Sequence, residues 1–211
     1  MRQKARNALY QRILDGRLAP NILINPAQLT RELGVSLTPV REAMLDLSGE
    51  GLIDNHAHRG FFVRPMSVAE VNEIYPLIVV LEAMALELAP PQPDDLVELE
   101  VLNREFTETD APGRRVDLDM RWHQKLLSRC TNTTLLAMLE SLKRRAARYE
   151  TAYMRNSAII LDSAEQHYAI LTALGKGDRA AASARLKENW DIGPRFLNPW
   201  LKRIIPEESV N

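Results

Sequence analysis

The sequence of 211 residues lacks the features that mark secreted and membrane proteins. It contains one cysteine, Cys130, so no disulfide can form within the chain, and we expect an intracellular protein with a partly buried thiol. The apolar run Ile78–Leu81 ends at Glu82, far short of the roughly 20 apolar residues that a membrane helix needs. No apolar core follows the basic N-terminal residues, so we expect no secretory signal and a cytoplasmic location.

Charge is unevenly divided along the chain, although the net charge is only −1. Residues 1–65 contain nine lysines and arginines against six acidic residues, a net charge of +3, and the remainder carries −4. A basic segment is typical of a module that binds a polyanion such as DNA, and an acidic remainder indicates a second task. A difference of three charges is small, so the motifs have to identify the module.

The first 50 residues contain three helical patterns separated by turn signals. Apolar residues at helical spacing predict a first helix that ends at Asp15-Gly16. Asn25-Pro26 and Thr38-Pro39 each combine a helix-capping residue with proline at the first helical position, which predicts two further helices. Gly34 ends the second helix, and the third has an apolar face made of Val40, Met44 and Leu47.

Two short strands are predicted directly after these helices. The apolar segments 52–53 and 61–63 flank a polar connection, residues 56–60, that ends in glycine as a hairpin tip does. Three helices followed by a hairpin are typical of a winged helix-turn-helix. We therefore expect a DNA-binding domain over residues 1–65.

The remaining residues carry almost no strand pattern. Proline and glycine breaks separate six helical patterns, which predicts an all-α bundle of about six helices over residues 68–203, followed by a tail, 204–211. The expected helices are 68–89, 94–108, 113–130, 133–155, 159–174 and 178–203. The fold class is therefore mostly α, with an N-terminal winged helix-turn-helix and a C-terminal helical bundle.

The segment Leu33-Gly-Val-Ser-Leu-Thr-Pro-Val-Arg41, with the Glu-Gly-Leu that follows at 50–52, resembles the GntR family of transcription regulators. The later pair Arg59-Gly60 resembles that family's wing. The resemblance covers nearly all of residues 5–65 and implies sequence-specific binding of double-stranded operator DNA. It places the contacts at six residues: Ser36, Thr38, Pro39, Arg41, Arg59 and Gly60.

Physical chemistry agrees with this assignment. The N-terminus of the third helix carries unpaired N–H groups and a partial positive charge, which attract a phosphate. Arg41 in its first turn can reach a phosphate or the edge of a guanine, and Arg59 at the hairpin tip can enter a minor groove. One departure is Leu37, where the family usually has arginine, so one contact is missing and the preferred operator differs.

The C-terminal half has a candidate cation site. Asp119 precedes His123 by four residues, so both side chains share one helical face, as a surface pair or as two ligands of one cation. Together with Asn132…Leu135, Glu165-Gln-His167 and Gly177-Asp178, this pair resembles the FadR-type ligand-binding domain over residues 68–203. The resemblance implies that Asp119, His123 and His167 hold zinc, nickel or manganese, with Asn189 in place of a fourth histidine. Because an amide is a poorer ligand than imidazole, either the metal is held more weakly or the site is only a polar cavity.

The same resemblance implies a homodimer that acts as a repressor and responds to a small-molecule effector, often a carboxylate. Arg145 and Arg148 lie three residues apart on one helix and are candidate effector ligands, although a solvated helix face explains them equally well. Ile78 stands where relatives often have arginine, which indicates a less acidic effector.

Two other classes of function stay open at this point. One is an all-α metal-dependent enzyme centred on Asp119, His123 and His167, but no nucleophile with a paired base is recognisable, so no catalytic residue is assigned. The other is a protein-binding adaptor that uses the winged helix as a docking face. Sequence-selective, salt-sensitive DNA binding separates both from a regulator.

Overall fold

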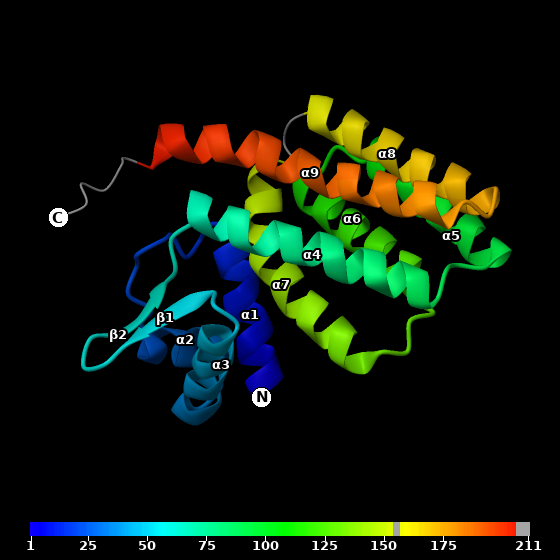
Figure 1. Ribbon diagram of the computed structural model, residues 1–211. Helices are drawn as coiled ribbons and strands as arrows, with labels where there is room; N and C mark the ends of the chain where they lie inside the picture. Colours follow the sequence, from blue (N-terminus) through cyan, green and yellow to red (C-terminus); the bar gives the residue numbers. More distant parts are fainter. Residues whose placement is uncertain (154–156, 206–211) are drawn as a thin grey trace. The chain divides into compact units, whose positions relative to one another are not determined.

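The computed structural model describes residues 1–153 and 157–205, which are mostly helical (Figure 1). The chain divides into two compact units, Met1–Met66 and Ser67–Asn211. The first unit combines three helices with a hairpin, and the described residues of the second unit contain helices only. The expected fold class is confirmed. Most of the predicted tail, 204–211, lies outside the described residues.

The first unit has the element order of a winged helix-turn-helix. Its helices are α1 (Arg2–Leu14), α2 (Pro26–Leu33) and α3 (Leu37–Gly49). The strands β1 (Ile53–His56) and β2 (Gly60–Val63) pair antiparallel, with the first residue of β1 opposite the last residue of β2. Because α1 and α2 both pack on α3, the apolar face of α3 lies at the centre of this unit.

Local capping explains where α2 and α3 begin. The Asn25 side chain accepts hydrogen bonds from the backbone N–H groups of the first turn of α2, and Gly34 ends that helix at a left-handed φ of 64°. Helix α3 begins earlier than predicted, because Ser36 and not Thr38 is its N-cap. Pro39 is then its third residue, still within the first turn, where the N–H that proline lacks has no partner to lose.

Over residues 67–153 and 157–205, the second unit is a bundle of six helices. Their bounds are α4 (Val68–Leu88), α5 (Pro93–Glu108), α6 (Pro112–Leu126), α7 (Thr133–Tyr153), α8 (Ser157–Gly175) and α9 (Arg179–Ile204). Helix α4 packs against α7 and α9, α5 packs against α6 and α8, and α8 runs beside α9 (Figure 1). This packing brings faces of α4, α6, α7, α8 and α9 towards one interior.

The end of one bundle helix was predicted wrongly, and the predicted end of another cannot be compared with the structure. Helix α6 stops at Leu126 and not at residue 130. At Leu127 the backbone leaves the helical path, with φ −100° and ψ 7°, and the Asn132 side chain then caps the next helix by accepting a hydrogen bond from the backbone N–H of Leu135. The predicted end of the fourth helix of the bundle, residue 155, lies outside the described residues.

The interior of the bundle is unusually polar. Buried charged or polar side chains come from all six helices of the second unit: Glu70, Glu82, Asp95, Asn103, Asp119, His123, Lys143, Arg148, Glu150, Ser163, His167, Ser183 and Asn189. Burying such groups is unfavourable unless they are paired or bind a ligand. Among the described helices, none is long and apolar enough to cross a membrane.

Candidate nucleic-acid interface and metal centre

Helix α3 presents a polar first turn to solvent. Its buried side is Val40, Ala43, Met44 and Leu47, as the apolar spacing predicts. Ser36, Thr38 and Arg41 are exposed, and Pro39 is half-buried. The Ser36 hydroxyl makes no capping hydrogen bond to the helix. The hydroxyls and the first-turn N–H groups are therefore available to an anion.

The hairpin places a second group beside this helix end. A groove of about 340 Å³ is lined by Arg41 of α3, by Gly60 and Phe61 of β2, and by residues 23–26. The structure thus brings together Arg41 and Gly60, which are 19 positions apart in the sequence. A recognition helix and a wing at one groove are the arrangement that contacts adjacent surfaces of a duplex.

The tip of the hairpin is built to expose Arg59. His58 has a positive φ of 62° and Gly60 one of 99°, so the chain turns sharply on both sides of this arginine. Its guanidinium lies 5.8 Å from the centre of the Phe62 ring, a cation–π contact that orients it without neutralising its charge.

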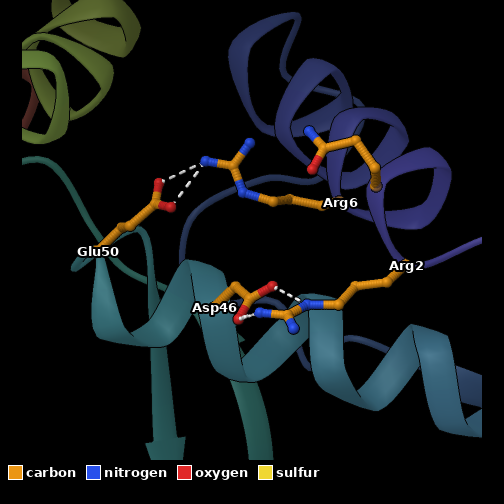
Figure 2. A pocket seen from close by; sticks show the side chains of 5 residues that line it. Arg2, Arg6, Asp46 and Glu50 are labelled. Carbon is orange, nitrogen blue, oxygen red and sulfur yellow. Dashed lines mark hydrogen bonds and ion pairs between the residues drawn. The ribbon is translucent and has the colours of Figure 1, made fainter. Parts of the chain in front are cut away.

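Ion pairs within the first unit distinguish structural arginines from available ones. Figure 2 shows Arg2 and Arg6 of α1 reaching Asp46 of α3 and Glu50, the residue that follows α3. These pairs hold α1 on α3. Three other arginines, all exposed, have no side-chain ion pair or side-chain hydrogen bond among the described residues: Arg31, Arg41 and Arg59.

Arg31 is the candidate that the sequence argument did not select. It lies in the last turn of α2, the helix that precedes the recognition helix, and that helix usually crosses the phosphate backbone. Its neighbour Glu32 binds Arg12, which removes the partner that the sequence offers to Arg31. The only sequence signal for Arg31 is its position in the helix-turn-helix.

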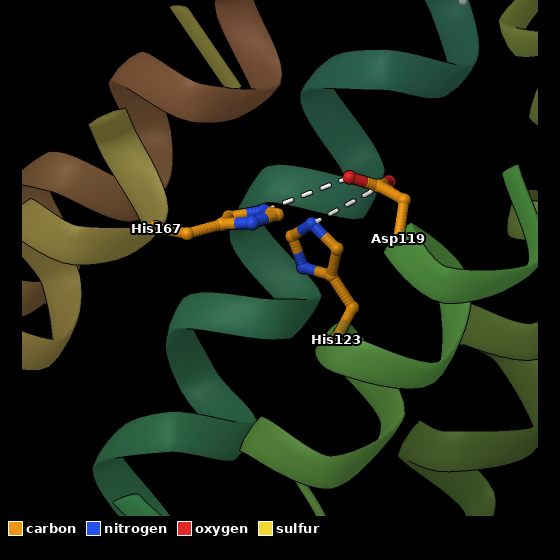
Figure 3. Close-up of side chains that lie close together, drawn as sticks. All are labelled: Asp119, His123 and His167. Atoms are coloured by element: carbon orange, nitrogen blue, oxygen red, sulfur yellow. Dashed lines mark ion pairs between the residues drawn. The ribbon is translucent and has the colours of Figure 1, made fainter. Parts of the chain in front are cut away.

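The bundle interior contains a cluster of three possible metal ligands (Figure 3). Asp119 and His123 lie on α6, His167 lies on α8, and all three are buried. Nε2 of His167 is 3.6 Å from Oδ1 of Asp119, and Nε2 of His123 is 4.0 Å from Oδ2 of Asp119. Ligands at 2.0–2.1 Å from a tetrahedral metal are about 3.4 Å apart, so small movements would close this shell.

Hydrogen bonds fix which nitrogen of each histidine faces the cluster. Nδ1 of His123 lies 2.9 Å from Oε2 of Glu82, and Nδ1 of His167 lies 2.9 Å from Oδ1 of Asn103. Both oxygens are acceptors, so each Nδ1 donates and Nε2 is the ring nitrogen that faces Asp119. Among the described residues, neither Nε2 of His167 nor Oδ1 of Asp119 has a hydrogen-bond partner. The residues present therefore fit a bound cation.

Burial sets the ionisation of the two ligands that face each other. Burial, together with the nearby charge of His123, keeps the pKa of His167 well below its ordinary value, so this imidazole is neutral, as a metal ligand must be. Burial raises the pKa of Asp119, and Glu82 adds to the rise, while His123 and Lys143 oppose it. A divalent cation would compensate the cost of burying this carboxylate.

Glu82 of α4 is a residue that sequence reasoning did not assign to the site. Its fully buried carboxylate accepts hydrogen bonds from His123 and from Nε1 of Trp190, the latter at 2.6 Å, and forms an ion pair with Lys143. Burial alone would raise the pKa of Glu82, but the charges of His123 and Lys143 outweigh it and lower the pKa to about 2. This ionised group connects four helices.

Glu150 adds a third carboxyl group to the same interior. It is buried on α7, and burial raises its pKa to about 8, with the charges of Asp119 and Glu82 adding to the rise and Lys143 opposing it. Glu82, Asp119 and Glu150 thus share one lysine. The electrostatic balance of the interior favours binding a cation.

Asn189 is buried near the cluster but contacts it indirectly. Its side-chain amide donates to the Ser163 hydroxyl at 3.3 Å, and Ser163 hydrogen-bonds Asp119. Asn189 therefore reaches the candidate ligands through one intervening side chain.

Arg145 and Arg148 lie on α7, and both bind Glu70 of α4. Nε of Arg145 is 2.8 Å from Oε1 of Glu70, and Arg148 and the Tyr149 hydroxyl bind the other oxygen. Their spacing does suit a carboxylate, but the carboxylate is one of the chain's own. Both guanidiniums are therefore bound to Glu70 in this structure, and a role of Arg145 and Arg148 in effector binding stays a prediction.

Helix α4 also carries an apolar stripe on its exposed side. Four large apolar residues lie three or four positions apart and are each about half exposed or more: Leu77, Val80, Met84 and Leu88. We call these four residues the α4 stripe. A contiguous apolar stripe on a helix is typical of a surface that binds another protein chain.

Two family models match this chain, one in each unit. Residues 1–63 match the model described as "Bacterial regulatory proteins, gntR family", and residues 73–191 match the model described as "FCD domain". The second match alone spans more than half of the chain. The resemblance found in the sequence is therefore confirmed.

Curated relatives carry regulator names. The HTH-type transcriptional regulator YdhC of Bacillus subtilis is 31% identical over 64% of this chain and 62% of its own length, so the match spans less than two thirds of that protein. The Nta operon transcriptional regulator of Aminobacter aminovorans is 32% identical over 82% of this chain and 84% of its own length. The HTH-type transcriptional repressor GlaR of Escherichia coli is 27% identical over 84% of this chain and 86% of its own length.

A solved structure shows the same fold. That of Escherichia coli McbR/YncC covers 94% of this chain and 97% of its own, with a TM-score of 0.80 at 24% sequence identity. Both units are included in the match.

Proposed function

Because this chain belongs to the GntR family of bacterial regulatory proteins and carries an FCD domain, we propose that it is a repressor whose operator binding is controlled by a small-molecule effector and a divalent metal ion. It is a DNA-binding transcription regulator and not an enzyme. The observation that carries the proposal is that Arg41, which no described side chain pairs with, lies beside Gly60 at one groove of the winged helix.

The proposed DNA contacts follow from exposure and charge. Ser36 and Thr38, at the N-terminus of α3 that Pro39 helps to form, bind a phosphate together with first-turn N–H groups. Arg41 reads a base edge in the major groove, and Arg59 enters the adjacent minor groove while Gly60 lets the backbone approach. Arg31 adds a phosphate contact from α2.

The DNA proposal is tested by comparing two arginine variants in a gel-shift assay. The probe is the DNA that flanks the protein's own gene, at physiological salt. Arg41→Ala should weaken binding about 5- to 150-fold per half-site, since a bidentate arginine contributes about 1–3 kcal/mol of base discrimination. Arg17→Ala, which removes an arginine bound to Asp15, should bind as the unchanged protein does. Equal affinity of both variants contradicts the proposed role of Arg41, and a chain that binds no duplex selectively would instead fit a protein-binding adaptor.

We propose that Asp119, His123 and His167 hold zinc, nickel or manganese. Two features support this: unpartnered ligand atoms face one another, and the other ring nitrogen of each histidine is held by Glu82 or Asn103. Asn189 occupies the place of the fourth histidine and approaches through Ser163, so a coordination position stays open. The metal would supply a positive centre for the carboxylate of an effector at that position.

We propose further that the protein acts as a homodimer through the α4 stripe. A second copy is the occupant that the function requires, because regulators of this kind bind paired half-sites with two recognition helices. Glu82 lies on the same helix as the stripe and binds His123, so occupancy of the site bears directly on α4. Effector binding would then shift the arrangement of the two DNA-binding units. Repression follows the relative named a repressor, GlaR.

A further inference from the structure

The first residue of the recognition helix is apolar and exposed. Leu37 begins α3 and has 46% of its surface accessible, between Ser36 and Thr38, which are exposed as well. In contrast, the apolar residues of this helix that face the core, such as Val40 and Met44, are fully buried. Leu37 therefore contributes little to the core of its own unit, and its side chain is available to a partner.

Leu37 shares its face of α3 with Arg41. Residues four positions apart lie one above the other on a helix, so Leu37, Arg41 and Leu45 form one exposed row. Leu45 is 53% exposed and lies about 12 Å further along the helix axis. Asp46, in contrast, is held by Arg2 of α1, so it lies on the protein-facing side. The exposed row reads apolar, basic, apolar.

The chemistry of a leucine side chain restricts what it can contact on DNA. It has no donor or acceptor, so it can bind neither a phosphate nor the polar edge of a base. The apolar group that a base pair presents in the major groove is the C5 methyl of thymine. Residues at the N-terminus of a recognition helix are the ones that reach base edges. Leu37 lies at the N-terminus of α3, where it can reach a base edge, whereas Leu45 lies about two turns further along the helix.

We propose that Leu37 selects thymine by packing on its C5 methyl at one position of each operator half-site, next to the base that Arg41 reads. The proposal rests on the proposed function and defines its specificity. Removing one methyl group from this contact should weaken binding about fourfold per half-site, or about 15-fold when both half-sites of a duplex are changed.

The test begins with full-length protein and a pool of random duplex DNA. Bound sequences are selected, and the affinity of the selected duplex is measured by fluorescence anisotropy at fixed salt. Each thymine is then replaced by deoxyuridine, which lacks only the methyl group. We expect one thymine per half-site to show the 15-fold loss when it is replaced in both half-sites. A C·G pair that carries 5-methylcytosine at that position should bind more tightly than the unmethylated C·G pair.

Three variants assign the effect to a residue. Leu37→Ala should bind the thymine and deoxyuridine duplexes equally well, and Leu37→Val should keep part of the discrimination. Leu45→Ala removes an equally exposed leucine from the same face and should discriminate as the unchanged protein does. Thermal unfolding checks that each variant is folded. We expect all three to fold, because both leucines are about half exposed.

The outcomes separate this proposal from the function on which it rests. If no sequence is selected from the pool, the proposed operator binding is contradicted, and the thymine contact of Leu37 fails with it. If a sequence is selected but no thymine responds to loss of its methyl, the thymine contact is overturned while operator binding stands. A methyl response that Leu37→Ala retains, or that Leu45→Ala abolishes, also overturns the assignment to Leu37.

Discussion

Nδ1 of His123 lies 2.9 Å from Oε2 of Glu82, so a proposed metal ligand on α6 is oriented by a carboxylate on α4. The two residues are 41 positions apart in the sequence. A histidine that donates from one nitrogen to a carboxylate presents the other nitrogen as a stronger ligand. This contact makes Glu82 a positioning residue for the proposed metal site and links that site to the helix that carries the α4 stripe.

The first prediction concerns this orienting contact. Glu82→Gln should lower zinc affinity about 10- to 100-fold, because an amide holds the His123 tautomer less firmly than a charged carboxylate. Affinity is measured by competition with a chromogenic chelator. The control is Glu87→Gln, an exposed glutamate on the same helix, which should leave zinc affinity unchanged.

Loss of Glu82 also leaves Lys143 buried without its counter-charge, so the variant should unfold more easily. A second variant, Glu82→Gln combined with Lys143→Met, removes that unpaired charge and separates stability from metal affinity. If both variants bind zinc as tightly as the unchanged protein, Glu82 does not position His123.

The second prediction is a gain of metal affinity. Asn189→His should raise zinc affinity, since imidazole is a better zinc ligand than an amide and Asn189 lies one side chain away from Asp119. Asn198→His, on the same helix but bonded to Asn72, is the control and should have no effect. Binding is followed by calorimetry and by the rise in melting temperature with added zinc. Equal affinities for both variants would count against an open coordination position near Asn189.

The third prediction tests the α4 stripe. Met84→Asp should convert the proposed dimer to a monomer, because a charge in an apolar interface is left desolvated and unpaired. Sedimentation equilibrium gives the mass in solution. Val97→Asp places the same charge on an exposed valine of α5, outside the stripe, and should leave the dimer intact. A Met84→Asp protein that stays dimeric would place the interface elsewhere.

The fourth prediction concerns the contact between α9 and α4. A Cβ atom added at Gly193 would lie 2.6 Å from Cε1 of Tyr75, a ring that is itself almost fully buried. Gly193→Ala should therefore destabilise the protein by about 1–3 kcal/mol, measured by urea unfolding. Gly175→Ala is the matched control, since no atom lies within 4 Å of the added Cβ, and it should be neutral or slightly stabilising.

The fifth prediction is a pH dependence of stability at the start of α5. Asp95 accepts a hydrogen bond from Arg129, one from the backbone N–H of Gln92 and one from Lys125, and these partners hold the pKa of Asp95 well below its usual range. A carboxyl group whose pKa is lowered on folding stabilises the protein above its unfolded pKa of about 3.9, and this stabilisation is lost as the pH falls through the lower folded value.

Asp95→Asn should consequently lower the melting temperature at pH 7, by an amount that corresponds to about 1 kcal/mol. The difference from the unchanged protein should shrink as the pH falls below about 4. Asp94→Asn, at the exposed neighbouring position, should show a much smaller effect at pH 7. A difference for Asp95→Asn that is the same at pH 3 and pH 7 would contradict the role of the charge.

Much of the fold is predictable from the sequence because helix signals are local. Asn25-Pro26 marks the start of α2, Gly34 its end, and the spacing of Val40, Met44 and Leu47 gives the buried face of α3. The start of α3 was predicted less well, since Ser36 and Thr38 are both good capping residues. Spacing alone also placed Asp119 and His123 on one face of α6.

The partners of buried charges could not be predicted in the same way. Arg145 and Arg148 form a regular pair in the sequence, yet their carboxylate, Glu70, comes from a helix some 75 positions earlier. In the same way, Glu32 forms an ion pair with Arg12, 20 positions away, and not with its sequence neighbour Arg31.

The sequence by itself determined the order of the elements, the helical faces and the family motif, because each depends on residues within a few positions of one another. Only the tertiary structure decided which arginines stay unpaired and which carboxylate orients His123. Those contacts join residues 20 to 108 positions apart, as in Arg12 with Glu32 and Trp190 with Glu82. The burial of these groups then shifts their pKa values, and burial cannot be predicted from residues a few positions apart.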